Sequence, residues 1–161
     1  MQIKTTLTQN QFAKLTGILL LKRLQVLFLI LAVIALIIGA LIAIIFFRNK
    51  DAYILVFVAV VFLGLFAFSI FNNAKRHYQN NPRIRQETTY EFSDKGVSIS
   101  KEGYASTIKW NEIIRIRKKA GLILIWQNKL IANVIAVKDV STEQLNEMKS
   151  LIARKNIPSN L

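Results

Sequence analysis

The sequence predicts an α+β membrane protein, in which a transmembrane helical hairpin is joined to a small antiparallel sheet and a C-terminal helix. Three observations support this fold class. Two uncharged apolar runs lie close together in the first half, a period of two follows over residues 88–137, and a capped amphipathic segment closes the chain. The composition agrees, because 53% of residues are apolar while the formal net charge is +13, so charge and hydrophobicity are segregated along the chain.

The two apolar runs are long enough to cross a bilayer. Residues 26–47 contain no charge, Pro, Asn or Gln, and residues 52–71 are also uncharged. As a helix, the first run is about 33 Å long, against a hydrocarbon core of roughly 30 Å. The four polar residues between them predict a hairpin over residues 24–71. A soluble bundle is the alternative, but it needs further helices. A cleaved signal peptide is disfavoured because a second run follows at once.

Charges beside the two runs predict the orientation. The basic residues Lys14, Lys22 and Arg23 precede the first run, and four more follow the second, whereas the connecting loop holds two basic residues and one acid. The positive-inside rule then predicts a multi-pass protein with both termini in the cytoplasm. Neither run contains an ionisable residue, which disfavours an ion or proton path.

Small residues predict where the two helices pack. Ala35, Gly39 and Ala43 recur every four residues on one face of the first helix, and Gly64 and Ala67 of the second are candidates to face them. We expect this set to pack within the hairpin, with a homodimer interface as the alternative.

Residues 1–23 are expected to form a strand and an interfacial helix. Residues 2–7 alternate weakly in polarity, which suggests a strand that adds to the later sheet. Thr8 and Gln11 have the spacing of a capping box, so a helix is expected from near Gln9, lying before the first span or continuous with it.

Residues 72–86 are polar and basic, contain a turn signal at 80–82, and are predicted to be a linker to a domain at 87–161. In that domain alternating polarity predicts about six short strands in an antiparallel meander: 88–93, 97–100, 105–110, 113–118, 122–126 and 130–137. Ser141 and Gln144 then form a capping box, and an apolar stripe follows with Leu145, Met148, Leu151 and Ile152, which a sheet face can cover.

The order of these elements, together with two motifs, resembles a known family. Residues 90–97 contain Tyr-x-Phe-Ser-x-x-Gly, residues 108–113 contain Trp-x-x-Ile, and the last helix opens with Ser-Thr-Glu-Gln. Nearly the whole chain resembles the YcxB-like family of small bacterial membrane proteins. This resemblance implies a pleckstrin-homology-like sheet or barrel in the cytoplasm, capped by the C-terminal helix, and a location in the bacterial inner membrane. It brings no catalytic residues, and it implies immunity against a membrane-acting toxin as an alternative function.

Basic residues form the candidate binding surface. Residues 115–119 include four of them, and on a strand Arg115 and Arg117 share one face while Ile114 and Ile116 are expected to point to the core. Lys138 is a further candidate for this patch. A solvated strand face is the alternative to contact with lipid headgroups or a partner. The full set of candidates is Lys75, Arg76, Arg83, Arg85, Arg115, Arg117, Lys118 and Lys119.

Other chemistry is disfavoured by the residues present. The acids of the domain are scattered, no glycine loop for phosphates is found, and no nucleic-acid motif accompanies the basic charge. With no Cys and one histidine, His77, we expect no metal and no other cofactor. Trp110 and Trp126 are expected to be core residues or interface anchors, and His77 a surface residue at headgroup level. The sequence thus predicts a non-enzymatic, membrane-anchored binding or scaffolding protein, engaging a membrane-protein partner or anionic inner-leaflet lipid.

Overall fold

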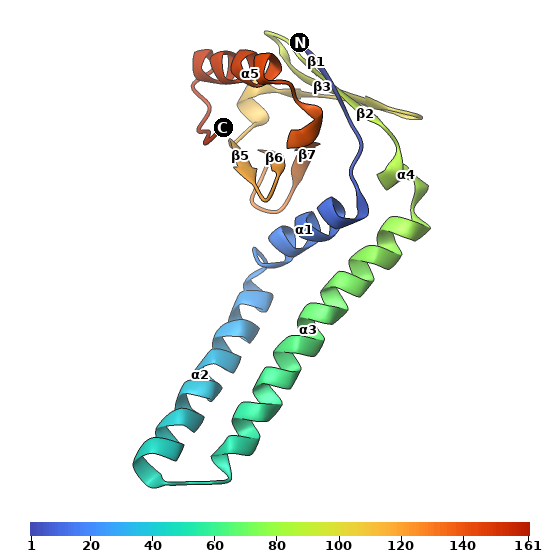
Figure 1. The fold of residues 1–161 in the computed structure, drawn as a ribbon. Helices are drawn as coiled ribbons and strands as arrows, with labels where there is room; N and C mark the ends of the chain where they lie inside the picture. The colour runs from blue at the N-terminus through green and yellow to red at the C-terminus, as the bar shows by residue number, and fades with distance from the viewer.

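The computed structural model describes all 161 residues as a long helical hairpin joined to a domain of two sheets and a helix (Figure 1). The helices are α1 (Gln9–Leu20), α2 (Leu24–Phe47), α3 (Ala52–Asn80), α4 (Pro82–Arg85) and α5 (Thr142–Arg154). The strands are β1 (Gln2–Thr5), β2 (Thr88–Phe92), β3 (Gly96–Lys101), β4 (Tyr104–Lys109), β5 (Arg115–Lys119), β6 (Leu122–Trp126) and β7 (Ala132–Ala136).

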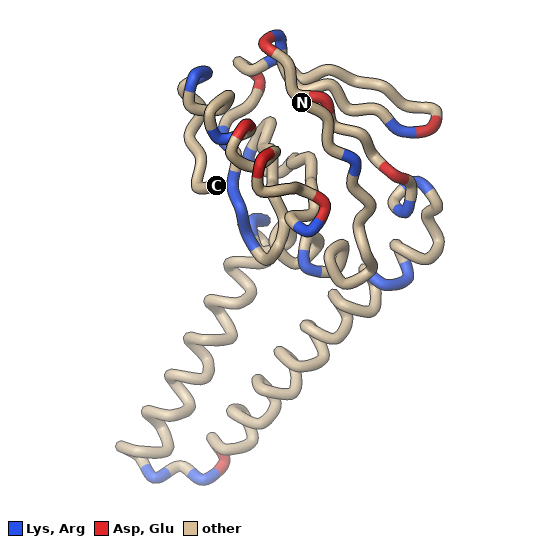
Figure 2. The backbone as a smooth tube through the Cα atoms, turned by 45° about the horizontal axis from the view of Figure 1, so that its top comes forward, with Lys and Arg blue, Asp and Glu red and all other residues tan.

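Helices α2 and α3 form the hairpin that the apolar runs predict, and both are long and apolar enough to cross a membrane. Residues 24–47 of α2 and 52–74 of α3 carry no charge, and Figure 2 shows this long uncharged stretch between the domain and the far turn. Their large apolar side chains point mostly outward and are exposed. Side chains of this kind on all faces are what a helix surrounded by lipid requires.

The segment predicted as a linker is largely helical. Helix α3 continues through Asn72–Asn80, and α4 follows after a turn at Asn81. The polar residues of this segment lie mostly on its exposed side, while Ala74 is buried and the Tyr78 hydroxyl donates a hydrogen bond to the Leu7 carbonyl at 2.8 Å. Contact with the N-terminal segment therefore sustains a helix where the composition alone suggests a loop.

The strands are confirmed, but they form two sheets instead of one meander. The first sheet has the order β1-β2-β3-β4 and the second β5-β6-β7, and all pairs are antiparallel. Strand β1 pairs with β2, placing Ile3 opposite Tyr90, so the suggested N-terminal strand does join the sheet. A 3₁₀ turn at Trp110–Glu112 separates the two sheets.

Two polar side chains, Tyr90 of β2 and Thr5 of β1, link the first sheet to β7 and the turn that follows it. The Tyr90 hydroxyl donates to the Val134 carbonyl at 3.1 Å, and the Thr5 hydroxyl donates to Asp139 Oδ2 at 2.7 Å. The Thr5 oxygen also accepts the Ala136 N–H at 3.1 Å. Burial raises the pKa of Tyr90 to about 12, although the hydrogen bond that its oxygen accepts from the Val134 N–H at 3.3 Å acts in the opposite direction. These links hold β1 and β2 against β7.

The main core lies between the sheets and α5. It contains Ile3, Tyr90, Val97, Ile116 and Ile123, covered by the predicted stripe of α5, of which Met148, Leu151 and Ile152 are buried and Leu145 is partly buried. Ser141 and Gln144 form the capping box expected at the start of α5. A single amphipathic helix thus covers the sheets, as the sequence predicts.

A second core attaches α1 to the outer face of the three-stranded sheet. Leu15 and Ile18 of α1 pack with Leu122, Leu124 and Trp126 of β6. The five apolar residues of β6 are all buried because alternate side chains face the main core and α1. Helix α1 begins at the Thr8–Gln11 capping box as predicted, and a break at residues 21–23 separates it from α2. The helix also packs against α3, so it couples the domain to the hairpin (Figure 1).

Candidate functional site

The candidate site lies at one end of the three-stranded sheet, where the last row of residues is Arg115, Trp126 and Ala132. We call this the Trp126 end; it also includes Ile114 and the loop 127–131. Arg115 is opposite Trp126, Arg117 opposite Leu124 and Lys119 opposite Leu122. Directly paired side chains of antiparallel strands share a face. Arg115, Arg117 and Lys119 therefore lie on the same face of the sheet as the β6 side chains that α1 covers.

Lys22, from the break between α1 and α2, completes this group of cations. Its Nζ lies 3.2 Å from the centroid of the Trp126 ring, and the guanidinium carbon of Arg115 lies 5.4 Å from the same centroid. Burial lowers the pKa of Lys22, and the charges of Arg115, Arg117 and Lys119 lower it further. None of the four takes part in an ion pair of the chain. The group is thus a concentration of positive charge with no acid to balance it.

Two buried hydrogen-bond donors at this end have no acceptor. The indole Nε1 of Trp126, a side chain only 1% exposed, lacks a partner, and so does the Nε of Arg115. The two cationic groups over the ring, Lys22 and Arg115, are themselves donors only. Leaving a buried donor unpaired costs about 1–3 kcal/mol. An acceptor is what these donors lack.

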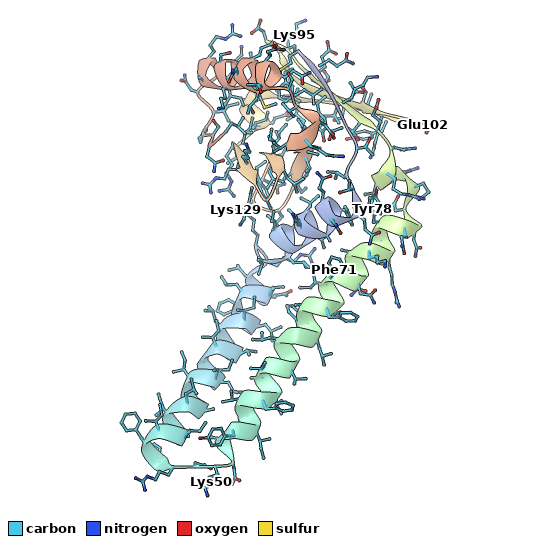
Figure 3. All side chains as sticks on the ribbon, in the orientation of Figure 1. Lys50, Phe71, Tyr78, Lys95, Glu102 and Lys129 are labelled. Carbon is cyan, nitrogen blue, oxygen red and sulfur yellow. The ribbon has the colours of Figure 1, made fainter.

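Exposed apolar side chains surround the same end. Leu130 and Ile131 are 55% and 56% exposed, and Ile114 is 52% exposed. Ile114 donates its N–H to the Trp126 carbonyl at 2.8 Å, and the loop is closed by a bond from the Gln127 N–H to the Ile131 carbonyl at 3.2 Å. Figure 3 shows Lys129 on the side of the domain next to α1, and Lys95 on the opposite side. The apolar groups thus lie near the start of α2.

The prediction for Ile114 was wrong, because strand β5 begins only at Arg115. Ile113 is buried instead, while Ile116 is fully buried as expected. Lys118 lies between Arg117 and Lys119 in β5, so its side chain is on the opposite face of the strand from the three cations. Its backbone N–H donates to Asn160 Oδ1 at 2.9 Å. Lys138 pairs with Asp139 at 3.7 Å.

The remaining basic candidates form a separate group. Lys75 and Arg76 are exposed on α3, and Arg83 and Arg85 are exposed on α4. Figure 1 shows α4 and β5 on opposite sides of α1. The structure therefore divides the eight candidates and places only Arg115, Arg117 and Lys119 beside Lys22.

The predicted small residues are mostly exposed, although Gly39 and Ala43 line a cavity that also includes Ala52 of α3. Ala35, Gly39, Gly64 and Ala67 are exposed, and Ala43 is half-buried. A Cβ atom added at Gly39 or Gly64 would meet nothing within 4 Å. Buried alanines pack the hairpin instead: Ala40, Ala52 and Ala59. Packing of the predicted set within the hairpin therefore stays a prediction, and so does the homodimer alternative.

The other singled-out residues lie apart from this site. His77 is exposed on α3. Trp110 packs on Phe92 with ring centroids 6.4 Å apart, and its Nε1 donates to the Ser93 carbonyl at 3.0 Å. Trp126 is a core residue, as expected. No three His, Asp or Glu side chains of the chain come together in a way that would hold a metal ion.

The comparison with protein families bears on the domain that carries this site. Residues 92–152 match the family model described as YcxB-like protein. The family resemblance expected from the motifs is thus confirmed over these residues, which include Arg115, Arg117 and Trp126 and exclude Lys22. No curated protein and no solved structure matches the chain.

Sequence reasoning missed Lys22, Leu130 and Ile131 as parts of the site. A signal for the loop exists, because two large apolar residues directly follow the turn-forming Gln127-Asn128-Lys129. Lys22 has no such local signal, since it reaches Trp126 only through the packing of α1.

Proposed function

We propose that this chain is a non-enzymatic binding module, anchored by α2 and α3 in the bacterial inner membrane, that rests its Trp126 end on the anionic cytoplasmic leaflet. The observation that carries the proposal is the meeting of exposed Leu130 and Ile131 with an unpaired group of cations beside the start of α2. An apolar edge next to basic charge suits the headgroup region, where both kinds of group find partners.

The two kinds of contact act on a domain that is already tethered. Each Lys or Arg near an anionic leaflet contributes about 1 kcal/mol, and full burial of a Leu or Ile side chain contributes about 1.5–3 kcal/mol. Because the anchor removes the cost of bringing the domain to the membrane, these contacts set its orientation. A domain held in one orientation presents its opposite surface to the cytoplasm.

The proposal includes a topology and a fold type. Both termini lie in the cytoplasm in a multi-pass arrangement, which the basic residues flanking α2 and α3 support. The domain is of the pleckstrin-homology type, which is supported by its two antiparallel sheets and closing helix. Lipid is the occupant that the exposed apolar edge favours, whereas a membrane-protein partner is an alternative outcome of the test. The immunity alternative stays a prediction.

A fluorescence experiment on the full chain tests the proposal. The protein has no Cys, so Leu130→Cys and Lys95→Cys each give one attachment point for an environment-sensitive dye. The proteins are placed in lipid nanodiscs of phosphatidylglycerol or phosphatidylcholine, and quenching by a spin-labelled lipid is measured. We expect strong quenching at position 130 in phosphatidylglycerol that weakens with salt, and none at position 95.

Two results would contradict the proposal. Equal quenching of the position 130 dye in both lipids removes the role of anionic charge. Absence of quenching at position 130 places this end away from the bilayer and favours a protein partner.

A further inference from the structure

The Trp126 end contains a chemical imbalance that bilayer contact alone does not resolve. Arg115, Arg117 and Lys119 share one face of β5, Lys22 lies close enough to feel their charges, and none of the four has a carboxylate partner. Four cations so placed repel one another, and partial burial strengthens this repulsion for Lys22 and Arg115, whereas Arg117 and Lys119 are exposed. A counter-anion at the centre of the group would relieve it.

The two orphaned donors lie in the same place. Trp126 Nε1 and Arg115 Nε are buried without acceptors, and both side chains come from the paired last row of the sheet. In proteins the great majority of buried polar groups are hydrogen-bonded, so an exception calls for an explanation. The nearest charged groups offer no lone pair. An oxyanion supplies both acceptor oxygens and negative charge.

We infer that the Trp126 end binds one phosphate group, held by Lys22, Arg115 and the indole N–H of Trp126. Arg presents several donors in a fixed planar arrangement that matches phosphate oxygens, and Lys adds a mobile point charge. Lys22 is half-buried with its Nζ above the face of the ring, and its flexible side chain can turn that charge from the ring to the phosphate. This inference rests on the proposed function and names the ligand chemistry of that surface.

Such a phosphate has two sources: the headgroup of an anionic lipid and free phosphate in the cytoplasm. Lys22 lies two residues before α2 begins, at the level where an anionic lipid presents its headgroup phosphate. A free phosphate in the cytoplasm offers the same oxygens. The experiment therefore has one arm for each source.

Fluorescence of Trp126 in the full chain tests the site. The protein has two tryptophans, so the variant Trp110→Phe leaves Trp126 as the only reporter. The variant is titrated with inorganic phosphate in an uncharged detergent, at constant ionic strength set with chloride. We expect a saturable change in emission, and at least about tenfold weaker binding for Lys22→Gln and for Arg115→Gln. Arg115→Lys keeps the charge but not the Nε donor, so we expect it to restore only part of the affinity.

Lys118→Gln is the matched control, because it removes the same charge from the same strand on the other face. We expect it to bind phosphate normally. Loss of binding equal to that of Arg115→Gln would overturn the inference, and so would an unchanged emission at saturating phosphate.

Nanodiscs separate the two sources. If phosphatidylglycerol discs prevent the response to added phosphate and phosphatidylcholine discs do not, the lipid headgroup is the ligand. If neither lipid competes, the site takes phosphate from solution. Each result supports a phosphate site. Failure of all phosphate responses would leave the salt-dependent quenching at position 130 intact, so the inference and the proposed function fail separately.

Discussion

Truncation of Ile18 tests whether α1 fixes the domain to the hairpin. Ile18 is 9% exposed and packs in the cluster with Leu122, Leu124 and Trp126. Ile18→Ala removes three carbons, each worth about 0.8 kcal/mol when buried, so at nine-tenths burial the loss is about 2.2 kcal/mol before any cavity term. Because about 1.4 kcal/mol is a tenfold change, local opening of α1 should become about 40-fold more frequent.

Limited trypsin digestion of the full chain in detergent measures this opening. Lys22 and Arg23 lie in the break after α1, and cleavage there follows the population of the undocked state when closing is fast. Cleavage at Arg154 in α5 reports global unfolding and should change much less. Asn10→Ala, on the exposed side of α1, is the control. Equal cleavage rates of Ile18→Ala and the unaltered protein at residues 22–23 would refute the docking of α1.

Three further predictions concern the domain and the topology. The phenol of Tyr90 has a pKa near 10 in the unfolded chain and about 12 in the folded one. The stabilisation that this group contributes is therefore fully present below pH 10 and is lost as the pH rises towards 12. The melting temperature should fall across this range, and Tyr90→Phe should make the fall shallower; an equally steep fall in Tyr90→Phe contradicts the assignment. A Cβ at Gly96 would lie 2.2 Å from the Ile108 carbonyl oxygen, with φ at +156°, so Gly96→Ala should lower the melting temperature far more than Gly103→Ala. The measurement is thermal unfolding of both variants, and equal melting temperatures would contradict the close approach. A reporter fused after Leu161 should be active in the cytoplasm, and activity in the periplasm would reverse the topology.

Most of the fold could be predicted from local patterns in the sequence. The uncharged runs, the alternation from Thr88 onward and both capping boxes depend on residues close together in the chain, and the structure contains each. The error at Asn72–Asn80 has a tertiary cause, because contact of Tyr78 with Leu7 and Phe12 stabilises a helix that its polar composition does not suggest.

The site was harder to predict because it depends on long-range packing. Lys22 meets Trp126 only after α1 docks on β6, and no pattern within either segment indicates the pairing. The position of Ile114 depended on where β5 begins, and strand ends are poorly specified by alternation.

The N-terminal strand also changes how the domain can be studied. A fragment from Arg83 lacks β1 and α1, so the full chain is the appropriate material.

Solid-state NMR on the full chain in phosphatidylglycerol bilayers tests the central claim most directly. With the indole nitrogens labelled with ¹⁵N, dipolar dephasing by ³¹P measures how near each tryptophan lies to a lipid phosphorus. A hydrogen bond from Trp126 Nε1 to a phosphate oxygen places the two nuclei about 4 Å apart, which gives strong dephasing. Trp110, whose Nε1 is bonded to the Ser93 carbonyl, serves as the internal control. We expect dephasing of Trp126 alone; a Trp126 signal that ³¹P leaves unchanged in these bilayers, and also after inorganic phosphate is added, would contradict the account.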